Sequence, residues 1–532
     1  LTTDQQVAGS NPVSRTRTSS RCVGRVSFFL RGMLTVNAKG VGTLVYGIFT
    51  YDLAILRTQT RSIMTAEKQG LWVTIRRIAA SDRISGLIML GFALAGLLLA
   101  NLPFTAHAFE QLEEFRIAIP RTNIDMGLGH WVQDGLLTVF FLTVGLELKQ
   151  ELTTGSLSNP KAAAVPMLCA VGGMLVPPVL FIAVIALFAH FGPGGAGELV
   201  IASGTDFSFG EMSHGWAVPT ATDIAFSLAV LALFAKALPG SIRAFLMTLA
   251  TVDDLLAIIL IAVFFSSVNA WYWFIGIAAC AVAWYFLVRM QKVPWLAVAI
   301  VGILAWVMMF EAGIHPTLAG VLVGLLTPAR ERFGEKSPRA ERYADKLQPF
   351  SALLALPIFA LFATGVHFES LTWALFVSPV VIAVIVALVV GKPLGIMITA
   401  WLSTHLAGLR MAKGLRVRDM FPAACACGIG FTVSFLIASL AYQDAELSAE
   451  SRFGVLIASL IAAVISGILL SRQSKRFEAA QRQSSETDDR YADDGTDDEV
   501  ETVLEDGTIA VSQMIGTRNE TKVIRGAVVG GA

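Results

Sequence analysis

The amino-acid sequence predicts an all-α polytopic membrane protein with about 12 transmembrane helices. Of its 532 residues, 55% are hydrophobic and 15% are charged, and the mean hydropathy is +0.66, whereas soluble domains carry about 25% charged residues. The apolar residues form long runs, and the basic residues gather in alternate loops. The 40 basic and 40 acidic side chains balance, so the composition does not favour a nucleic-acid partner.

The expected spans follow from the lengths of the apolar runs. A helix needs about 20 apolar residues to cross the hydrocarbon core, so we divided the chain at glycine, proline and charge clusters. The predicted spans lie near 84–103, 131–148, 162–189, 218–235, 244–266, 270–288, 294–311, 315–328, 349–366, 372–402, 421–442 and 453–471. The fourth is weak as an isolated span because it contains a proline and an aspartate, and the eighth is short.

The basic residues of the loops indicate the orientation of the membrane domain, which we place at 84–471. Lysine and arginine collect on the cytoplasmic side of a membrane. With the N-terminus inside, the cytoplasmic loops hold sixteen of them and the opposite loops hold three, Arg116, Arg121 and Arg452. Both termini are therefore predicted to be cytoplasmic.

The two ends of the chain differ in composition from the membrane domain. Residues 1–63 begin with leucine and contain "SNPVSRTRTSSR", so we interpret them as a non-native or disordered extension, with Met64 or Met33 as the start of translation. Residues 64–83 form a cytoplasmic N-terminal segment in this interpretation. Residues 472–532 contain the acidic run "SSETDDRYADDGTDDEV" and are predicted to form a disordered cytoplasmic tail.

An adjacent carboxylate pair, Asp253 and Asp254, interrupts the apolar stretch "FLMTLATVDDLLAIILIAVFF". A central aspartate costs about 2.5–3.5 kcal/mol to insert, and each large apolar residue returns about 0.3–0.6 kcal/mol. The helix therefore inserts only if its acids face protein or water. Successive helix residues point about 100° apart, so one acid can face a cavity and the other needs a partner. A helix cap or a polar contact between helices explains this pair poorly.

Lys392 offers a cationic counterpart inside "VIVALVVGKPLGIMITAW". A membrane lysine often extends to an interface, but the apolar residues on both sides favour an acidic partner for this one. The acids that lie within predicted spans are Asp134, Asp223, Asp253 and Asp254, and the residues alone do not choose among them.

Two predicted spans carry residues that interrupt a helix. The segment "VPTATD" places a proline and two threonines ahead of Asp223, and "CGIGFT" places two glycines in a late span. Paired interrupted spans in corresponding positions are the best sequence indication of a transporter site. Where two such helices cross, we expect Asp223 to neutralise their positive N-termini and Lys392 their negative C-termini.

Six ordered motifs on these spans closely resemble the NhaA family of sodium/proton antiporters. They are "FFLTVGLELKQEL", "VPTATDIAFSLAVLAL", "LATVDDLLAIILIA", "IHPTLAGVLVG", "GKPLGI" and "CGIGFTVSFLIASLA". The resemblance covers roughly residues 80–470 and implies inverted repeats with two interrupted, crossing helices. It also implies electrogenic exchange of sodium or lithium for protons, for pH and sodium homeostasis, in a bacterial plasma (inner) membrane.

The resemblance also implies roles for the polar residues of the spans. Asp253 and Asp254 would form the cation and proton site, with Asp254 as the main ligand of transported sodium and Asp253 as the partner of Lys392. Thr222 and Asp223 would lie at the unwound crossing. The segment 113–127 alternates weakly like a β-hairpin, which in the family supports a homodimer.

One further acid matches an accessory position of the family, and two further groups lie at a turn between spans. Asp134 would be an accessory acid in the second span, and Glu311 with His315 lies at a turn between two spans. Histidine changes charge near neutral pH, so His315 is a candidate for a pH response. A histidine that merely satisfies a turn is the plainer alternative.

The cytoplasmic rim around "GLELKQEL" is a second candidate for a pH response. Its charged residues are Glu147, Lys149 and Glu151. Members of the family carry a basic residue where this chain has Gln150, so the chain departs from the family pattern at this rim.

Two other function classes compete with exchange. A sodium-coupled symporter of an organic solute would need an additional substrate pocket, and the set of Lys392, Asp253 and Asp254 argues against it. An intramembrane enzyme would need a nucleophile or a catalytic acid pair on separate helices. No such arrangement is evident, although Asp223 and Asp254 could mimic an acid pair geometrically. No nucleotide-binding fingerprint occurs, and the five cysteines fall mostly in apolar runs. We therefore expect no cofactor and no enzymatic activity.

Overall fold

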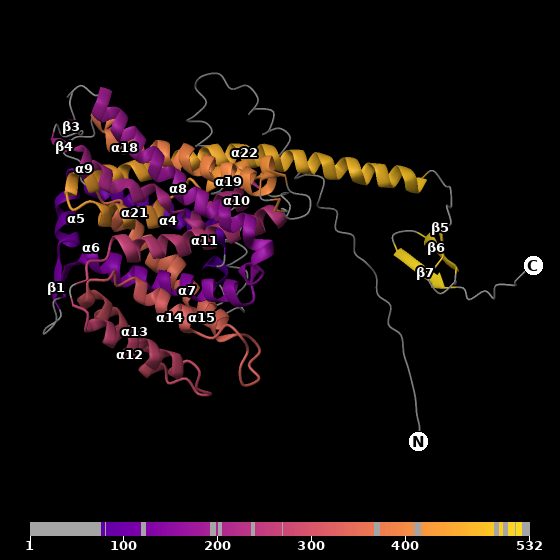
Figure 1. Cartoon of the computed structure of the whole chain (residues 1–532), viewed down its shortest axis with the longest axis horizontal. Helices are drawn as coiled ribbons and strands as arrows, with labels where there is room; N and C mark the ends of the chain where they lie inside the picture. The colour runs from indigo at the N-terminus through magenta and orange to yellow at the C-terminus, as the bar shows by residue number, and fades with distance from the viewer. Residues whose placement is uncertain are drawn as a thin grey trace, which may run out of the picture. The chain divides into compact units, whose positions relative to one another are not determined.

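The computed structural model divides into two compact units, Leu1–Ile75 and Arg76–Ala532. The described residues are 76–79, 81–118, 124–191, 198–200, 205–235, 240–268, 270–366, 373–406, 408–409, 416–493, 500–503, 509–515 and 518–523. The predicted N-terminal extension therefore lies outside the described residues. Most of the described residues of the second unit are helical (Figure 1).

The helices follow one another along the chain in the order that the apolar runs predict. The first half contains α4 (Asp82–Asn101), α5 (Ala106–Glu113), α6 (Leu128–His130), η1 (Trp131–Leu136), α7 (Leu137–Thr153), η2 (Ser156–Ser158), α8 (Pro160–Phe191), α9 (Phe209–Ser213), η3 (His214–Thr220), α10 (Ile224–Phe234) and α11 (Gly240–Phe264). The second half contains α12 (Trp273–Leu287), α13 (Trp295–Ala312), α14 (Leu318–Leu326), α15 (Arg339–Phe350), η4 (Ser351–Ala355), α16 (Leu356–Ala363), α17 (Trp373–Val377), α18 (Pro379–Val386), η5 (Ala387–Gly391), α19 (Lys392–His405), η6 (Val417–Met420), α20 (Phe421–Ala426), α21 (Phe431–Ala441) and α22 (Ala445–Asp493).

These helices confirm an all-α polytopic membrane protein. Among the described residues, eight helices are long and apolar enough to cross a membrane, and two bent pairs bring the number to ten. Each of the twelve expected spans contains a helix, but α12 and α14 are shorter than a full crossing. The count of twelve therefore stays a prediction.

Small residues allow the helices around the centre to pack closely. A Cβ atom on Gly395 of α19 would lie 2.2 Å from the carbonyl oxygen of Gly172 on α8. A Cβ atom on Gly320 of α14 would lie 2.3 Å from the carbonyl oxygen of Thr138 on α7. Close approach through small residues is the usual way that membrane helices associate. The contact between α8 and α19 fixes the start of α19, where Lys392 lies.

Two short hairpins accompany the helices. Strand β1 (Arg116–Ala118) pairs antiparallel with β2 (Asp125–Gly127), with Ile117 opposite Met126. This pairing agrees with the weak alternation of the sequence at 113–127. Strands β3 (Glu198–Val200) and β4 (Asp206–Ser208) form a second antiparallel pair.

The C-terminal segment differs from the predicted unstructured tail. Helix α22 runs to Asp493, beyond the boundary that we placed at residue 471. Residues 472–493 contain neither glycine nor proline, and the first glycine after the span is Gly495, so nothing local ends the helix earlier. Further along the chain, β5 (Val500–Val503), β6 (Ile509–Ile515) and β7 (Arg518–Val523) form an antiparallel sheet in the order β5-β6-β7.

Candidate functional site

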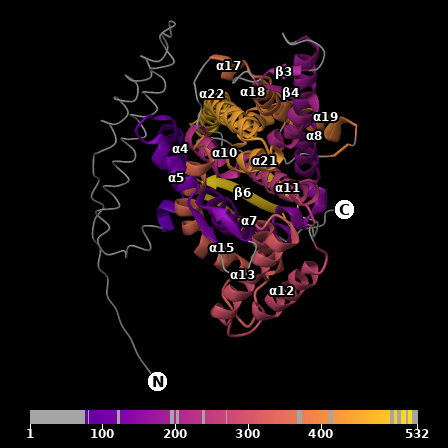
Figure 2. The ribbon, with the colours of Figure 1, turned by 90° about the vertical axis from the view of Figure 1, so that its left-hand side faces the viewer.

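Two bent helix pairs meet at their breaks. The pair Phe209–Thr220 and Ile224–Phe234 bends by 51°, and the pair Val417–Ala426 and Phe431–Ala441 bends by 60°. Within the second unit, η3 of the first pair packs against α21 of the second, and α10 packs against α20 and α11 (Figure 2). These breaks fall where the sequence predicted interrupted helices.

Hydrogen bonds join the two breaks directly. The backbone N–H of Asp223 donates to the carbonyl oxygen of Ile429 over 2.7 Å. The Thr222 hydroxyl donates to the carbonyl oxygen of Cys427 over 3.1 Å. Backbone groups that a broken helix leaves unpaired thus find partners in the other break, as a water-free interior requires.

Asp223 lies at the N-termini of two helices at once. Its Oδ1 accepts from the backbone N–H of Phe226 in α10 over 2.9 Å. Its Oδ2 accepts from the Thr432 hydroxyl over 2.8 Å and from the Thr432 backbone N–H over 3.2 Å, in α21. Negative charge is stabilised at helix N-termini, and the side chain is only 3% exposed. The contact matches the position that the sequence argument gave to Asp223.

Lys392 pairs with Asp253 and not with another of the four acids. Its Nζ lies 2.8 Å from Asp253 Oδ2, and both side chains are buried. The same ammonium group donates to the carbonyl oxygen of Thr220, the last residue of η3. A π-helical turn, η5, comes directly before Lys392. The lysine therefore neutralises one acid and one helix C-terminus.

Asp254 is the neighbouring acid without such compensation. It is 7% exposed and makes no hydrogen bond or ion pair with any residue that the structure describes. Asp253, Asp223, Glu147 and Lys392 are close enough to interact with it electrostatically. Its carboxylate oxygens are therefore available to a proton or a cation.

Asp134 and His315 come together from distant parts of the sequence. The Nδ1 atom of His315 lies 3.8 Å from Asp134 Oδ1, and the Thr317 hydroxyl lies 3.3 Å from the same ring nitrogen. Asp134 is in the π-helical turn η1, and its carbonyl oxygen accepts from the Trp306 indole over 2.9 Å. Glu311 lies one helical turn before His315, near the end of α13.

The rim around Glu147, Lys149 and Glu151 is connected to the helix of the carboxylate pair. Glu151 accepts from the Ser156 backbone N–H and hydroxyl, each over 2.8 Å. The Ser156 hydroxyl lies 2.9 Å from the hydroxyl of Thr248 on α11. Glu147 is exposed and Lys149 is half-buried on α7.

Several of these partners are absent from the sequence analysis. Ser227 donates to the carbonyl oxygen of Ala426 over 2.9 Å, which adds a further bond between the breaks. Its position four residues after Asp223 puts both on one face of α10 and was a usable signal. Trp306, Ser156 and Thr248 gave no comparable signal, because their partners lie far away in the sequence.

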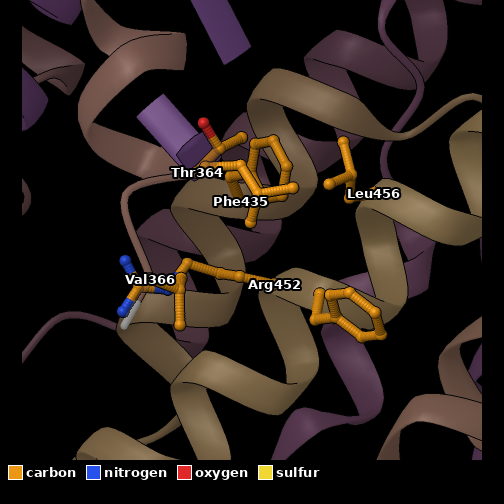
Figure 3. A pocket seen from close by; sticks show the side chains of 7 residues that line it. Thr364, Val366, Phe435, Arg452 and Leu456 are labelled. Carbon is orange, nitrogen blue, oxygen red and sulfur yellow. The ribbon is translucent and has the colours of Figure 1, made fainter. Parts of the chain in front are cut away.

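A small pocket lies apart from the carboxylates, between α4, α16, α21 and α22 (Figure 3). Its lining is mainly apolar and includes Leu97, Phe435 and Leu456, with Thr364 and Arg452 as its polar side chains. None of the acids of the site lines it, so this pocket is not the place where the carboxylates meet an ion.

No resident metal centre is apparent in the part of the chain that the structure describes. No group of three or more histidine, cysteine, aspartate or glutamate side chains there could hold a metal ion. A cation at Asp254 would therefore need backbone or water oxygens to complete its coordination.

The fold and the site together define a class of protein. Interrupted helices that meet near a buried set of charges are typical of secondary transporters. Within that class, the chain belongs to the family described as Na+/H+ antiporter 1, whose model matches residues 76–210 and 205–470.

Curated relatives cover most of the chain. A protein of Bifidobacterium adolescentis is 85% identical over 458 residues, which are 86% of this chain and 100% of the relative. A protein of Bifidobacterium breve is 80% identical over 78% of this chain and 90% of its own length. A protein of Bifidobacterium longum is 81% identical over 77% of this chain and 87% of its own length. All three carry the name Na(+)/H(+) antiporter NhaA.

Proposed function

We propose that this chain exports sodium, or lithium, in exchange for protons, and that Asp254 binds either ion in turn. The observation that carries the proposal is the difference between two adjacent acids: Lys392 neutralises Asp253, whereas Asp254 is buried without a partner among the described residues. The names of the Bifidobacterium relatives support the same activity. No observation favours a sodium-coupled symporter.

The mechanism is competition for one carboxylate. An aspartate can hold a proton, or it can coordinate a small hard cation together with carbonyl and water oxygens. Binding of one ion disfavours binding of the other. A carboxylate removed from water and close to other acids is costly to leave ionised and unpaired. Asp254 is therefore stabilised by whichever cation reaches it. Lys392 already neutralises Asp253 through its Oδ2 atom, although Oδ1 has no hydrogen-bond partner among the described residues.

The surrounding residues would keep the breaks in place while Asp254 exchanges its ion. Asp223 and Thr222 hold the two breaks together through their contacts with Thr432 and Cys427. Because the breaks bond mainly to each other, the helical halves on either side are the elements that would move to alternate access. We propose that the exchange is electrogenic and serves pH and sodium homeostasis.

A pH response would involve groups at two places. His315 with Asp134 forms a looser pair than Lys392 with Asp253, since the closest atoms are 3.8 Å apart in the first pair and 2.8 Å apart in the second. At the cytoplasmic rim, Glu151 reaches α11 through a chain of hydroxyl contacts. We include Glu147, Lys149 and Glu311 in this set.

The setting of the protein follows from the same proposal. The loop charges support a multi-pass protein of the bacterial plasma (inner) membrane with both termini cytoplasmic, which a reporter fused after Lys346 would test. The β1–β2 hairpin supports a homodimer within the lipid bilayer, which the oligomeric state of a protein lacking 116–127 would test.

Replacing Asp254 tests the function directly. Asp254→Asn should insert and fold but lose cation-driven proton movement in proteoliposomes, because an amide can contact a cation but cannot exchange a proton for it. Asp345→Asn is the matched control, since Asp345 is exposed on α15. Normal exchange by the Asp254 variant would remove that residue from the site.

A further inference from the structure

The carbonyl groups at the C-terminal end of α10 are capped by a side chain from another helix. The last carbonyl groups of a helix have no partner within it and form the negative end of its dipole. The last turn of α10 contains no basic residue of its own. The other end of this helix is the break, where the Asp223 side chain accepts from the Phe226 backbone N–H.

Arg83 of α4 supplies the missing positive charge. Its Nη2 donates to the carbonyl oxygen of Ala232, in the last turn of α10. The two helices also touch closely one turn further along α4, where a Cβ atom on Gly86 would lie 2.7 Å from the Cβ atom of Ala229. Helices α4 and α10 lie beside each other in the fold (Figure 2).

We propose that Arg83 is a positioning residue for ion exchange. It holds the C-terminal end of α10 in place, and through this rigid helix it holds Asp223 at the N-terminal end. The inference rests on the proposed function of the Asp254 site. Helix α10 has a negative charge, Asp223, at its positive end and a positive charge, Arg83, at its negative end. Each charge is complementary to the helix dipole where it lies.

A displacement at one end of α10 reaches the other. The helix has 11 residues and is therefore about 16 Å long, short enough to move as one rigid rod. At its break, Ser227 and Asp223 contact the second broken helix through Ala426 and Thr432. Loosening the C-terminal end would change the position of Asp223, which interacts electrostatically with Asp254, and a small misplacement of a binding group weakens binding strongly.

The test measures sodium-driven proton movement by the full chain in proteoliposomes, normalised to the amount of inserted protein. Arg83→Gln should raise the apparent sodium KM about three- to ten-fold, the range for loss of one ordinary hydrogen bond. Arg83→Lys, which keeps the charge, should recover most of the wild-type KM. Gly86→Ala, which forces α4 and α10 apart, should shift KM in the same direction as Arg83→Gln.

Arg76→Gln is the matched control, because Arg76 is exposed and a few residues away, and its KM should match the wild type. An Arg83→Gln protein with a lower Tm but an unchanged sodium KM would show that Arg83 only stabilises the fold, and would overturn the proposal. The wild-type protein distinguishes this outcome from an error in the proposed function. If the wild type moves no protons in response to sodium, the proposed function itself is refuted.

Discussion

Two contacts in the centre of this molecule each bury a carboxylate, and they compensate its charge in different ways. Where α11 meets α19, Asp253 lies 2.8 Å from the ammonium group of Lys392. Where α10 meets α21, Asp223 accepts only from uncharged donors, those of Phe226 and Thr432. The first contact is an ion pair, and the second relies on hydrogen bonds and two helix N-termini.

This difference shows what is special about Asp254. It lies next to the ion pair in sequence and within electrostatic reach of Asp223 and Lys392, yet it forms neither an ion pair nor a hydrogen bond with any described residue. The two compensated acids hold structure together. The uncompensated acid is the one whose charge a transported ion can satisfy.

The largest expected effect on stability comes from the ion pair. Lys392→Ala leaves Asp253 buried with an uncompensated charge, and removing one partner of a buried pair costs about 3–5 kcal/mol in the free energy of unfolding. Adding Asp253→Asn should recover much of that loss. Thermal unfolding of the purified single and double variants would measure both effects.

Lys292→Ala is the control for this cycle, because Lys292 is exposed in a loop. If the losses in stability caused by Lys392→Ala and Asp253→Asn simply add, the two side chains have no interaction energy. The proposed difference between the two contacts would then be wrong.

A smaller effect is expected at the second contact. Thr432→Val removes one hydroxyl donor to Asp223 but leaves the backbone donors of Thr432 and Phe226. The free energy of unfolding should fall by about 1.5–3 kcal/mol, the usual value for one hydrogen bond to a charged group. Thr404→Val is the control, since the Thr404 hydroxyl donates within its own helix to Ala400. A loss as large as that of Lys392→Ala would mean that the two contacts are equivalent.

The smallest effect concerns a charged cluster outside the site, at the start of α15. Glu335 Oε1 lies 2.7 Å from Arg339 Nη2, and Glu335 Oε2 lies 2.6 Å from Arg342 Nη2. The hydrogen bonds from Arg339 lower the pKa of Glu335. A depressed pKa in the folded protein gives stability that is fully present above the unfolded value of about 4.3 and lost as pH falls through the folded value. This cluster should therefore be insensitive to pH across the neutral range.

Glu335→Gln should lower stability at pH 7 by about 0.5–1 kcal/mol and by progressively less as the pH falls below about 4. Unfolding of the variant at several pH values measures this, with the exposed Glu331 in Glu331→Gln as the control. A destabilisation that varies between pH 6 and 8 would contradict the assignment, and would make this cluster a sensor of neutral pH.

The sequence predicted the elements of the site better than their partners. Charges inside apolar runs are costly, so Asp223, Asp253, Asp254 and Lys392 stand out in any reading of the chain. Four acids remained open as partners of Lys392. The choice depends on how α11 and α19 both pack against α8, which is a property of the folded chain.

Contacts between distant segments were the least predictable. The sequence around Asp134 does not indicate its contact with His315, and the reverse also holds. Asp134 lies in the π-helical turn η1, and His315 lies far along the chain in a turn after α13. The continuation of α22 to Asp493 was missed for a different reason. Acidic composition alone suggested disorder, although no helix-breaking residue interrupts 472–493.

The central claim is that sodium and protons compete for Asp254, and the apparent sodium KM as a function of pH tests it most directly. In proteoliposomes that contain the full chain, KM should rise as pH falls along the acidic limb, by about ten-fold per pH unit where the protonated site predominates. The maximal rate at saturating sodium should change far less over the same range. A sodium KM that stays constant while the maximal rate falls would show that a distant titrating group gates transport, and would contradict competition at Asp254.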